Sequence, residues 1–163
     1  YPKTGVMFRD ITTLLKDATG FRLAVTSLAD YFRGQHIDRV AGIEARGFIL
    51  GAAVAFELGL GFIPVRKKGK LPAATVGQNY DLEYGTDRIE IHADAIANGE
   101  SILLIDDLLA TGGTALAACS LIQSMGGNIQ GCGFVIDLPD LGGRQRLQER
   151  GIPVYSLCEF EGD

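Results

Sequence analysis

The sequence predicts an α/β fold in which helices flank a largely parallel, twisted sheet. Short apolar runs alternate with helical stretches along the chain, which is the pattern of successive βαβ units. The 163 residues, 47% hydrophobic and 21% charged, suit one globular domain with a substantial core. We therefore expect a single domain over residues 1–163.

Five apolar runs are the expected strands. The run Ser101–Ile105 (SILLI) carries only aliphatic side chains after its serine, which makes it the strongest strand candidate. The expected strands span 39–43, 62–65, 101–105, 131–136 and 154–157.

Helices are expected between these strands. Residues 21–33 place apolar side chains at helical spacing and stop at Gly34, a residue that often ends helices. A helix over 114–125 should end in the same way at Gly126. Further helices are expected over 47–58 and 144–149.

The stretch 70–87 (KLPAATVGQNYDLEYGTD) interrupts the alternation, because it is polar, contains Gly and Pro, and has no helical period. Two interpretations remain open. A long aperiodic segment in a compact domain is typical of a functional, flexible loop. Alternatively, it is a surface β-hairpin that joins 76–82 to 88–92.

The composition excludes several classes of protein. No apolar run reaches the roughly 18 residues of a membrane-spanning helix. The net charge of −5 disfavours a nucleic-acid partner. Three cysteines without a CxxC spacing and only two histidines favour reduced thiols in a cytoplasmic protein over a disulfide framework or a zinc site. The chain starts at Tyr1 rather than Met, so we expect an N-terminal segment to be missing, and a leader could have gone with it.

The strongest local signal is ILLIDDLLATGGTA at 102–115. An apolar strand leads into Asp106 and Asp107, and a loop ending in Thr111-Gly112-Gly113-Thr114 leads into a helix. Backbone N–H groups of such a turn can cradle a phosphate. The vicinal carboxylates can accept hydrogen bonds from a sugar diol and would favour Mg²⁺ beside a pyrophosphate. The alternatives are a strand-end aspartate like that of response regulators, or a simple helix N-cap.

Two further segments could bind anions. Glu44-Ala45-Arg46-Gly47 follows an expected strand, so Arg46 can offer a forked guanidinium where Gly47 permits close approach of the backbone. The segment 66–70 (RKKGK) carries four cations in five residues, which can stabilise the charge of a leaving pyrophosphate. A solvated arginine and a solvated basic turn are the alternatives.

Glu83 and Phe8 are candidates for the chemistry of a base. On a closing loop, the Glu83 carboxylate could exchange a proton with a ring nitrogen. The Phe8 ring could stack on a purine. The alternatives are an ordinary hairpin carboxylate and an ordinary core side chain.

The sequence ILLIDDLLATGGT resembles the binding motif for 5-phosphoribosyl pyrophosphate (PRPP) of type I phosphoribosyltransferases. GVMFRDIT at 5–12, EARGF at 44–48, VRKKGKLP at 65–72 and YDLEYGTD at 80–87 are similar to blocks of the adenine phosphoribosyltransferases, bacterial members most closely. The resemblance covers nearly the whole chain. It implies the type I fold with a small hood and a flexible catalytic loop, Mg²⁺ as cofactor held mainly through the substrate, and a homodimer.

The resemblance also implies a reaction, in which adenine and PRPP give AMP and pyrophosphate, and a role for each site residue. Glu83 would be the acid/base. The 5′-phosphate would bind to Ala110, Thr111, Gly112, Gly113 and Thr114, and the ribose to Asp106 and Asp107. Pyrophosphate would bind to Arg46, Gly47, Arg66, Lys67, Lys70 and Tyr84. Adenine would bind to Met7, Phe8, Arg9, Leu108 and Leu138.

Two rival functions remain. A phosphoribosyltransferase for hypoxanthine-guanine, xanthine or orotate would share the PRPP motif, but the blocks at 5–12 and 80–87 favour adenine. A regulator could keep the PRPP pocket, bind nucleic acid and transfer nothing. The acidic balance and the presence of Glu83 disfavour that regulator.

Overall fold

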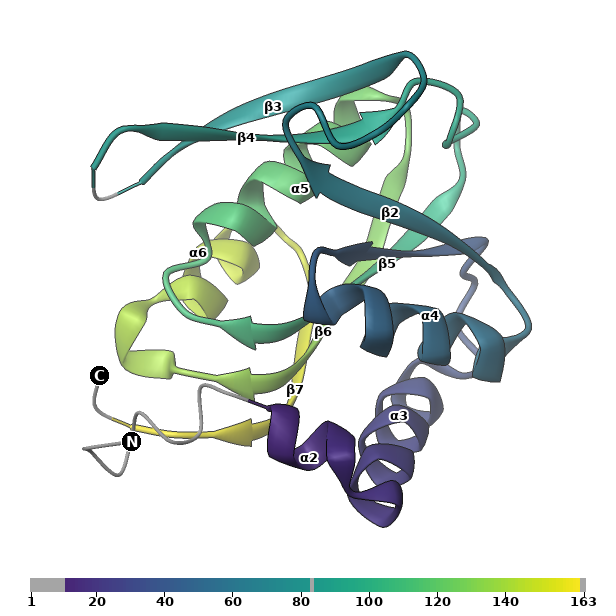
Figure 1. The fold of residues 1–163 in the computed structure, drawn as a ribbon, viewed down its shortest axis with the longest axis vertical. Coiled ribbons are helices and arrows are strands. Elements are labelled where there is room, and N and C mark those ends of the chain that lie inside the picture. Colours follow the sequence, from purple (N-terminus) through teal and green to yellow (C-terminus); the bar gives the residue numbers. More distant parts are fainter. Residues whose placement is uncertain (1–10, 83, 162–163) are drawn as a thin grey trace.

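A computed structural model describes residues 11–82 and 84–161. Its helices and strands alternate as the sequence predicts (Figure 1). The helices are α2 (Thr12–Lys16), α3 (Ala18–Phe32), α4 (Arg46–Leu58), α5 (Gly113–Ser124) and α6 (Gly143–Glu149), with a short 3-10 helix η1 (Pro139–Leu141). The strands are β1 (Arg39–Ile43), β2 (Gly61–Lys67), β3 (Thr75–Asp81), β4 (Thr86–His92), β5 (Ser101–Leu109), β6 (Asn128–Asp137) and β7 (Val154–Glu159).

The strands form one seven-stranded sheet in the order β3-β4-β2-β1-β5-β6-β7. The five strands from β2 to β7 in this order are parallel. The hairpin β3–β4 (Thr75–His92) adds two antiparallel strands at the edge next to β2. The chain runs from β1 to one side of the sheet and then returns to β5 on its other side, so a topological switch point lies between β1 and β5.

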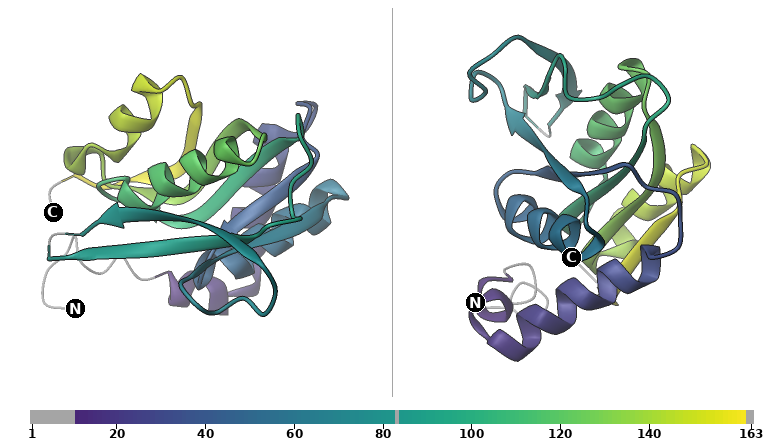
Figure 2. Two further views of the ribbon diagram at one scale, coloured as in Figure 1. Left: turned by 90° about the horizontal axis from the view of Figure 1, so that it is seen from above. Right: turned by 90° about the vertical axis from the view of Figure 1, so that its right-hand side faces the viewer.

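Helices cover both faces of the sheet (Figures 1 and 2). Residues of β5 alternate between two cores: Ile102 and Leu104 pack on the α5 side, and Leu103 and Ile105 pack on the side of α3 and α4. All four side chains are fully buried. This two-sided burial explains why the strand has a continuous apolar sequence rather than an alternating one.

The predicted α/β fold with a largely parallel sheet is confirmed. Every predicted strand and helix is present, with ends that differ by a few residues. Sequence analysis missed α2, because its five residues bury no side chain and are too few to show a helical period. The predicted hairpin is present and begins within the segment 70–87; its strands pair from Thr75 with His92 to Asp81 with Thr86. Its flexibility stays a prediction.

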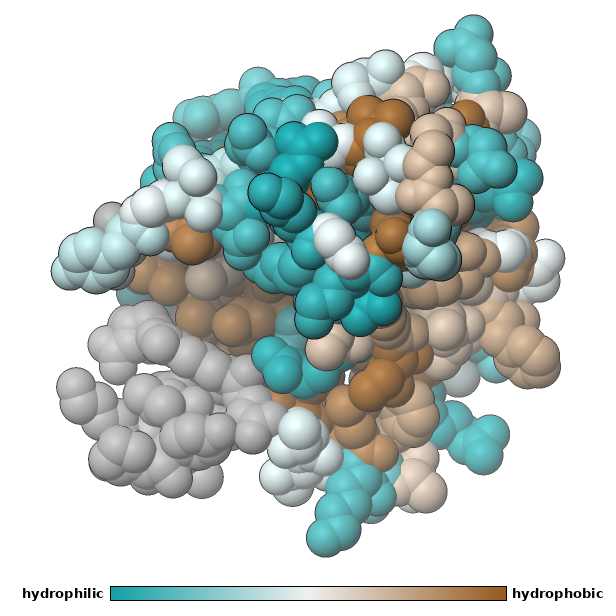
Figure 3. Space-filling model, turned by 45° about the horizontal axis from the view of Figure 1, so that its top comes forward, coloured by the Kyte–Doolittle hydropathy of each residue, from teal (hydrophilic) through white to brown (hydrophobic). Residues whose placement is uncertain are grey.

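Among the described residues, no helix is long and apolar enough to cross a membrane. Figure 3 shows one face of the molecule, on which hydrophilic side chains gather in the upper part and apolar ones mainly below.

Candidate functional site

The candidate site lies at the carboxyl ends of β1 and β5, which are neighbours in the sheet. Ligands of open α/β sheets bind beyond the carboxyl ends of strands at a switch point. Beyond β1 the chain enters the Glu44–Gly47 segment, and beyond β5 it enters the loop before α5. The topology therefore brings two of the three predicted anion-binding segments together, although Arg46 and Asp107 lie 61 positions apart in the sequence.

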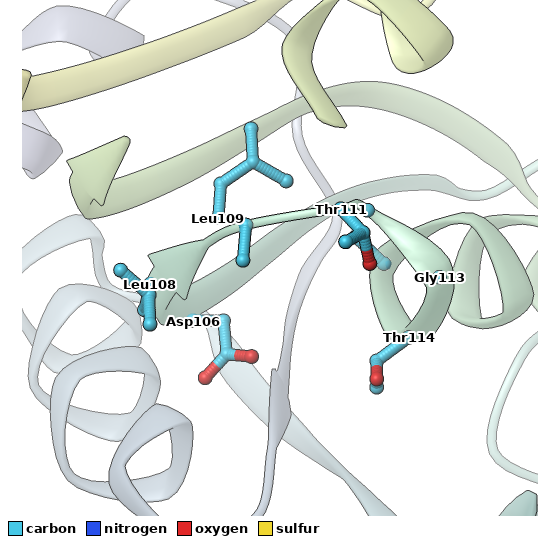
Figure 4. A pocket seen from close by; sticks show the side chains of 9 residues that line it. Asp106, Leu108, Leu109, Thr111, Gly113 and Thr114 are labelled. Carbon is cyan, nitrogen blue, oxygen red and sulfur yellow. The ribbon is translucent and has the colours of Figure 1, made fainter. Parts of the chain in front are cut away.

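The loop between β5 and α5 encloses a hollow of about 120 Å³. Its lining comprises Asp106 and residues 108–115. In Figure 4 the Asp106 carboxylate and the hydroxyls of Thr111 and Thr114 lie around the same space. Gly112 precedes α5 with a φ of +88°, a left-handed conformation that favours glycine. The hollow thus combines a carboxylate, two hydroxyls and a helix N-terminus, which together suit a phosphorylated sugar.

The two acids differ in their environment. The Asp107 side chain is 8% exposed, and its Oδ2 lies 2.5 Å from Nε of Arg46. Its backbone N–H donates to Oδ1 of Asp106 at 2.8 Å. Asp106 keeps some exposed surface, yet burial of its carboxyl, followed by the negative charge of Asp107, raises the pKa of Asp106 well above its usual range. Asp107 is therefore paired with Arg46, whereas Asp106 lines the hollow.

Glycine at 47 is required by the close approach of α4 to β5. A Cβ on Gly47 would lie 3.0 Å from both Oδ1 of Asp106 and the carbonyl oxygen of Ile105. Any larger residue would press on the Asp106 carboxylate. The peptide bond between Glu44 and Ala45 is cis.

Arg66 is held at the end of β2 by two groups of the β1–α4 segment. Its Nε lies 3.4 Å from Oε1 of Glu44, and its guanidinium lies over the Phe48 ring, 5.5 Å from the centroid. Glu44 also accepts a hydrogen bond from the backbone N–H of Lys67 at 2.6 Å. The sequence motifs assign no role to Glu44 itself. Its place directly after a buried strand, inside the EARGF block, was the signal that could have found it.

Lys67 is engaged with the hairpin. Its Nζ lies 2.7 Å from Oδ2 of Asp87 and 2.7 Å from the Tyr80 hydroxyl. Burial opposes the charge of Lys67, but the hydrogen bonds to Asp87 and Tyr80 outweigh it, so the pKa of Lys67 is raised. Lys67 therefore ties β2 to the hairpin, and two of its three ammonium N–H groups are directed to Asp87 and Tyr80.

The hairpin and the turn before it carry a second set of charges. Glu90 accepts hydrogen bonds from the backbone N–H of Gly69 at 3.0 Å and from Arg88 at 3.1 Å. These contacts, the one from Gly69 foremost, lower the pKa of Glu90. Lys70 lies exposed on this turn, and Tyr84 is 86% exposed beyond β3. Neither lines the hollow at the end of β5.

We expect Asp87→Asn to loosen the hairpin. The hydrogen bond from Lys67 is the main cause of the lowered pKa of Asp87. A lowered carboxyl pKa stabilises the fold above the pKa of the unfolded chain, about 3.9, and this stabilisation is lost as the pH falls through the folded value. At pH 7, amide hydrogen exchange across β3 and β4 should accelerate by roughly threefold to tenfold.

The wild-type protein should lose the same protection as the pH drops below about 4, after correction for intrinsic exchange rates. The variant should lose less protection, because among the described residues of the hairpin only Glu90 still has a lowered carboxyl pKa. Equal exchange in both proteins at every pH would show that the Lys67 contact does not hold the hairpin.

The residues predicted to bind the base are only partly described. Leu108 lines the hollow, whereas Leu138 is 2% exposed in the core on the side of α3 and does not line it. Met7, Phe8, Arg9 and the predicted acid/base Glu83 lie outside the described residues. The roles of these residues in adenine binding and in proton transfer stay predictions.

Comparisons with known proteins agree with this geometry. Residues 12–151 match the model of the phosphoribosyl transferase domain. The adenine phosphoribosyltransferase of Nitrosospira multiformis is 63% identical over 163 residues, which cover 100% of this chain and 93% of that protein. This chain belongs to the adenine phosphoribosyltransferase family.

Two solved structures of that family have the same fold. The Rhodothermus marinus adenine phosphoribosyltransferase superposes with a TM-score of 0.88 at 49% identity, covering 93% of this chain and 85% of that one. The Saccharomyces cerevisiae enzyme, solved with an imino-altritol bisphosphate and adenine, has a TM-score of 0.84 at 37% identity and covers 91% of this chain and 85% of that one. The resemblance stated from the sequence motifs is therefore confirmed.

Proposed function

We propose that this member of the adenine phosphoribosyltransferase family binds PRPP across the switch point between β1 and β5 and transfers its phosphoribosyl group to adenine. The products are AMP and pyrophosphate. The observation that carries the proposal is that Asp106 and the loop residues 111–114 line the same hollow. The adenine bound in the yeast relative supports the choice of base.

In this assignment, the loop residues Ala110 to Thr114 bind the 5′-phosphate. Asp106 and Asp107 accept hydrogen bonds from the ribose hydroxyls. Arg46 and Gly47 lie next to these acids, so a pyrophosphate on C1 of the ribose would extend from the acids toward the β1–α4 segment. On the hairpin side, the pyrophosphate would be approached by the segments that carry Arg66, Lys67, Lys70 and Tyr84.

The reaction is a displacement at C1 of the ribose, with inversion. A ring nitrogen of adenine forms a bond to C1 as the bond from C1 to the pyrophosphate oxygen breaks, and the electron pair of that bond leaves with pyrophosphate. Glu83 takes the proton that the adenine ring loses. The arginines and lysines stabilise the charge that develops on the leaving group, and the phosphates and carboxylates stabilise an oxocarbenium-like transition state.

Magnesium is the proposed cofactor, and the donor set fits it. Mg²⁺ prefers oxygen ligands and is commonly held by one or two carboxylates together with substrate phosphates. Asp106 and Asp107 offer such carboxylates, while Asp107 is already paired with Arg46. No group of three or more potential ligands occurs among residues 11–82 and 84–161. The metal would therefore be bound mainly through PRPP, whose leaving oxygen it would polarise.

The family resemblance also supports a homodimer located in the cytoplasm. Exposed large apolar side chains on α3 and α4, such as Leu23 and Phe56, offer apolar surface for self-association. No nucleic acid or membrane is assigned as a partner.

A base-panel assay tests the proposal. The protein is incubated with PRPP, Mg²⁺ and either adenine, hypoxanthine, guanine, xanthine or orotate, and the product is identified by mass. We expect AMP from adenine, little product from the other bases, and loss of turnover when a chelator removes Mg²⁺. A nucleotide of another base as the main product would contradict the proposal. So would nucleic-acid binding without consumption of PRPP.

A further inference from the structure

The start of α6 packs against the loop between β5 and α5 from the side away from the hollow. The backbone N–H of Gly143 donates to the carbonyl oxygen of Ala110 at 3.0 Å. The approach is close: a Cβ on Gly143 would lie 2.6 Å from that oxygen and 3.0 Å from the nitrogen of Gly112. No residue of α6 lines the hollow. The sequence LGGR at 141–144 therefore supports the loop without touching its contents.

Arg146 supports the next peptide of the loop. Its Nη1 donates to the carbonyl oxygen of Thr111 and also to that of Leu141, at 3.2 Å. The guanidinium lies against Gly142, where a Cβ would be 3.6 Å from Nη1. One exposed side chain thus bridges η1 and the phosphate loop.

These two contacts fix the direction of the loop's donors. In a planar trans peptide, the C=O of one residue and the N–H of the next point in opposite directions. With the carbonyls of Ala110 and Thr111 held toward α6, the N–H groups of Thr111 and Gly112 point away from α6. Within the described chain, neither N–H has a protein acceptor. Both are therefore available to an anion in the hollow.

We propose that Gly143 and Arg146 are positioning residues, which orient the N–H groups of Thr111 and Gly112 toward the 5′-phosphate. This inference rests on the proposed function of the loop as the phosphate cradle. It gives a role to the LGGRQR segment at 141–146, to which the sequence motifs assigned none.

Arg146→Ala is the first test. The affinity for ribose 5-phosphate and for AMP, measured by calorimetry, should fall about tenfold, as expected for one weakened hydrogen-bonding group. Affinity for adenosine and pyrophosphate, which do not use the cradle, should stay unchanged. In turnover, the KM for PRPP should rise by a similar factor while kcat changes less than about twofold, because the phosphate is held equally in the ground and transition states.

Arg150→Ala is the matched control. Arg150, at the C-terminal end of α6, also bridges to another element, donating to Ser120 at 2.9 Å and to Gln123 at 3.2 Å in α5. It does not touch the loop, so its removal should leave all four affinities unchanged. Equal behaviour of the two variants would overturn the proposal, as would a loss in Arg146→Ala that is the same for adenosine as for AMP.

Two further variants distinguish an effect of the Arg146 charge from an effect of its hydrogen bond to the loop. Arg146→Gln keeps a donor and loses the charge, so it should restore part of the affinity for ribose 5-phosphate. If Arg146→Lys were equal to wild type while Arg146→Gln were as weak as Arg146→Ala, Arg146 would act through its charge and not by positioning the loop.

Gly143→Ala tests the backbone contact. It should weaken ribose 5-phosphate binding more than Arg146→Ala does, because its Cβ would displace the Ala110 carbonyl. Gly61→Ala is the control, since its Cβ would meet only the end of the Arg39 side chain at 3.5 Å. Equal affinity in the two glycine variants would contradict the role of Gly143.

The positioning proposal and the proposed function can fail separately, because binding of ribose 5-phosphate does not need turnover. A wild-type protein that fails to make AMP would refute the proposed function. The effect of the variants on ribose 5-phosphate binding would still test the positioning proposal.

Discussion

Replacing Glu83 by glutamine is expected to lower the rate of the chemical step by at least about 100-fold, the usual contribution of a general acid or base. Glutamine keeps the size and hydrogen-bonding reach of the side chain but cannot accept the proton of the adenine ring. Affinity for PRPP should change less than about twofold, because no part of PRPP is assigned to Glu83. The rate should be measured in a single turnover, since product release limits many enzymes that close a loop.

Asp81→Asn is the control for Glu83→Gln. It removes one negative charge from the same hairpin at an exposed position, so a general electrostatic effect would appear in both variants. A single-turnover rate of Glu83→Gln equal to that of Asp81→Asn would remove Glu83 from the mechanism and leave the proton to solvent or to another group.

Asp107→Ala is expected to weaken PRPP binding on the order of 10- to 100-fold. The expected size follows from hydrogen bonds between a charged group and the ribose hydroxyls, at about 1.5–3 kcal/mol each. The direction in which the PRPP affinity changes is informative, because PRPP is an anion. If Asp107 acted only through its charge, removing this carboxylate from beside Arg46 would tighten binding. Weaker binding would therefore show that the Asp107 carboxylate contacts PRPP, through the ribose hydroxyls or through Mg²⁺, and does not act only through its charge.

Glu100→Gln is the matched control for Asp107→Ala. Glu100 forms a carboxylate–arginine pair with Arg39, 3.0 Å from its Nε, at the opposite end of the same two strands. Each variant should lower the free energy of unfolding by about 1 kcal/mol, because both arginines are 45% exposed and can be hydrated. Only Asp107→Ala should change the PRPP affinity. An unaltered or tighter affinity would contradict the ribose assignment.

The fold was largely predictable because its elements are strongly patterned. The SILLI strand is apolar throughout since two cores enclose it, and glycines such as Gly34 and Gly126 mark the ends of helices. The position of the site followed from the strand–acid–acid–glycine pattern, because parallel strands carry their ligands at their carboxyl ends. The short α2 has no such pattern.

Contacts between distant segments could not be predicted. Lys67 was assigned to pyrophosphate by the family resemblance of the segment 65–72. Its partners Asp87 and Tyr80 follow from the register of the hairpin, which local patterns do not determine. Likewise, Arg146 meets Thr111 only because α6 folds back on the loop, 35 residues from it in sequence. Short sequence motifs indicate residues that contact a ligand. They do not indicate residues such as Arg146, which hold the ligand-binding loop in place.

A crystal structure with bound AMP tests the central claim most directly. The account predicts the 5′-phosphate within hydrogen-bond distance of the N–H groups of residues 111–114 and the ribose hydroxyls on the carboxylates of Asp106 and Asp107. A phosphate bound instead at Arg66 and Lys67, with the loop before α5 empty and the two acids free of the sugar, would contradict it.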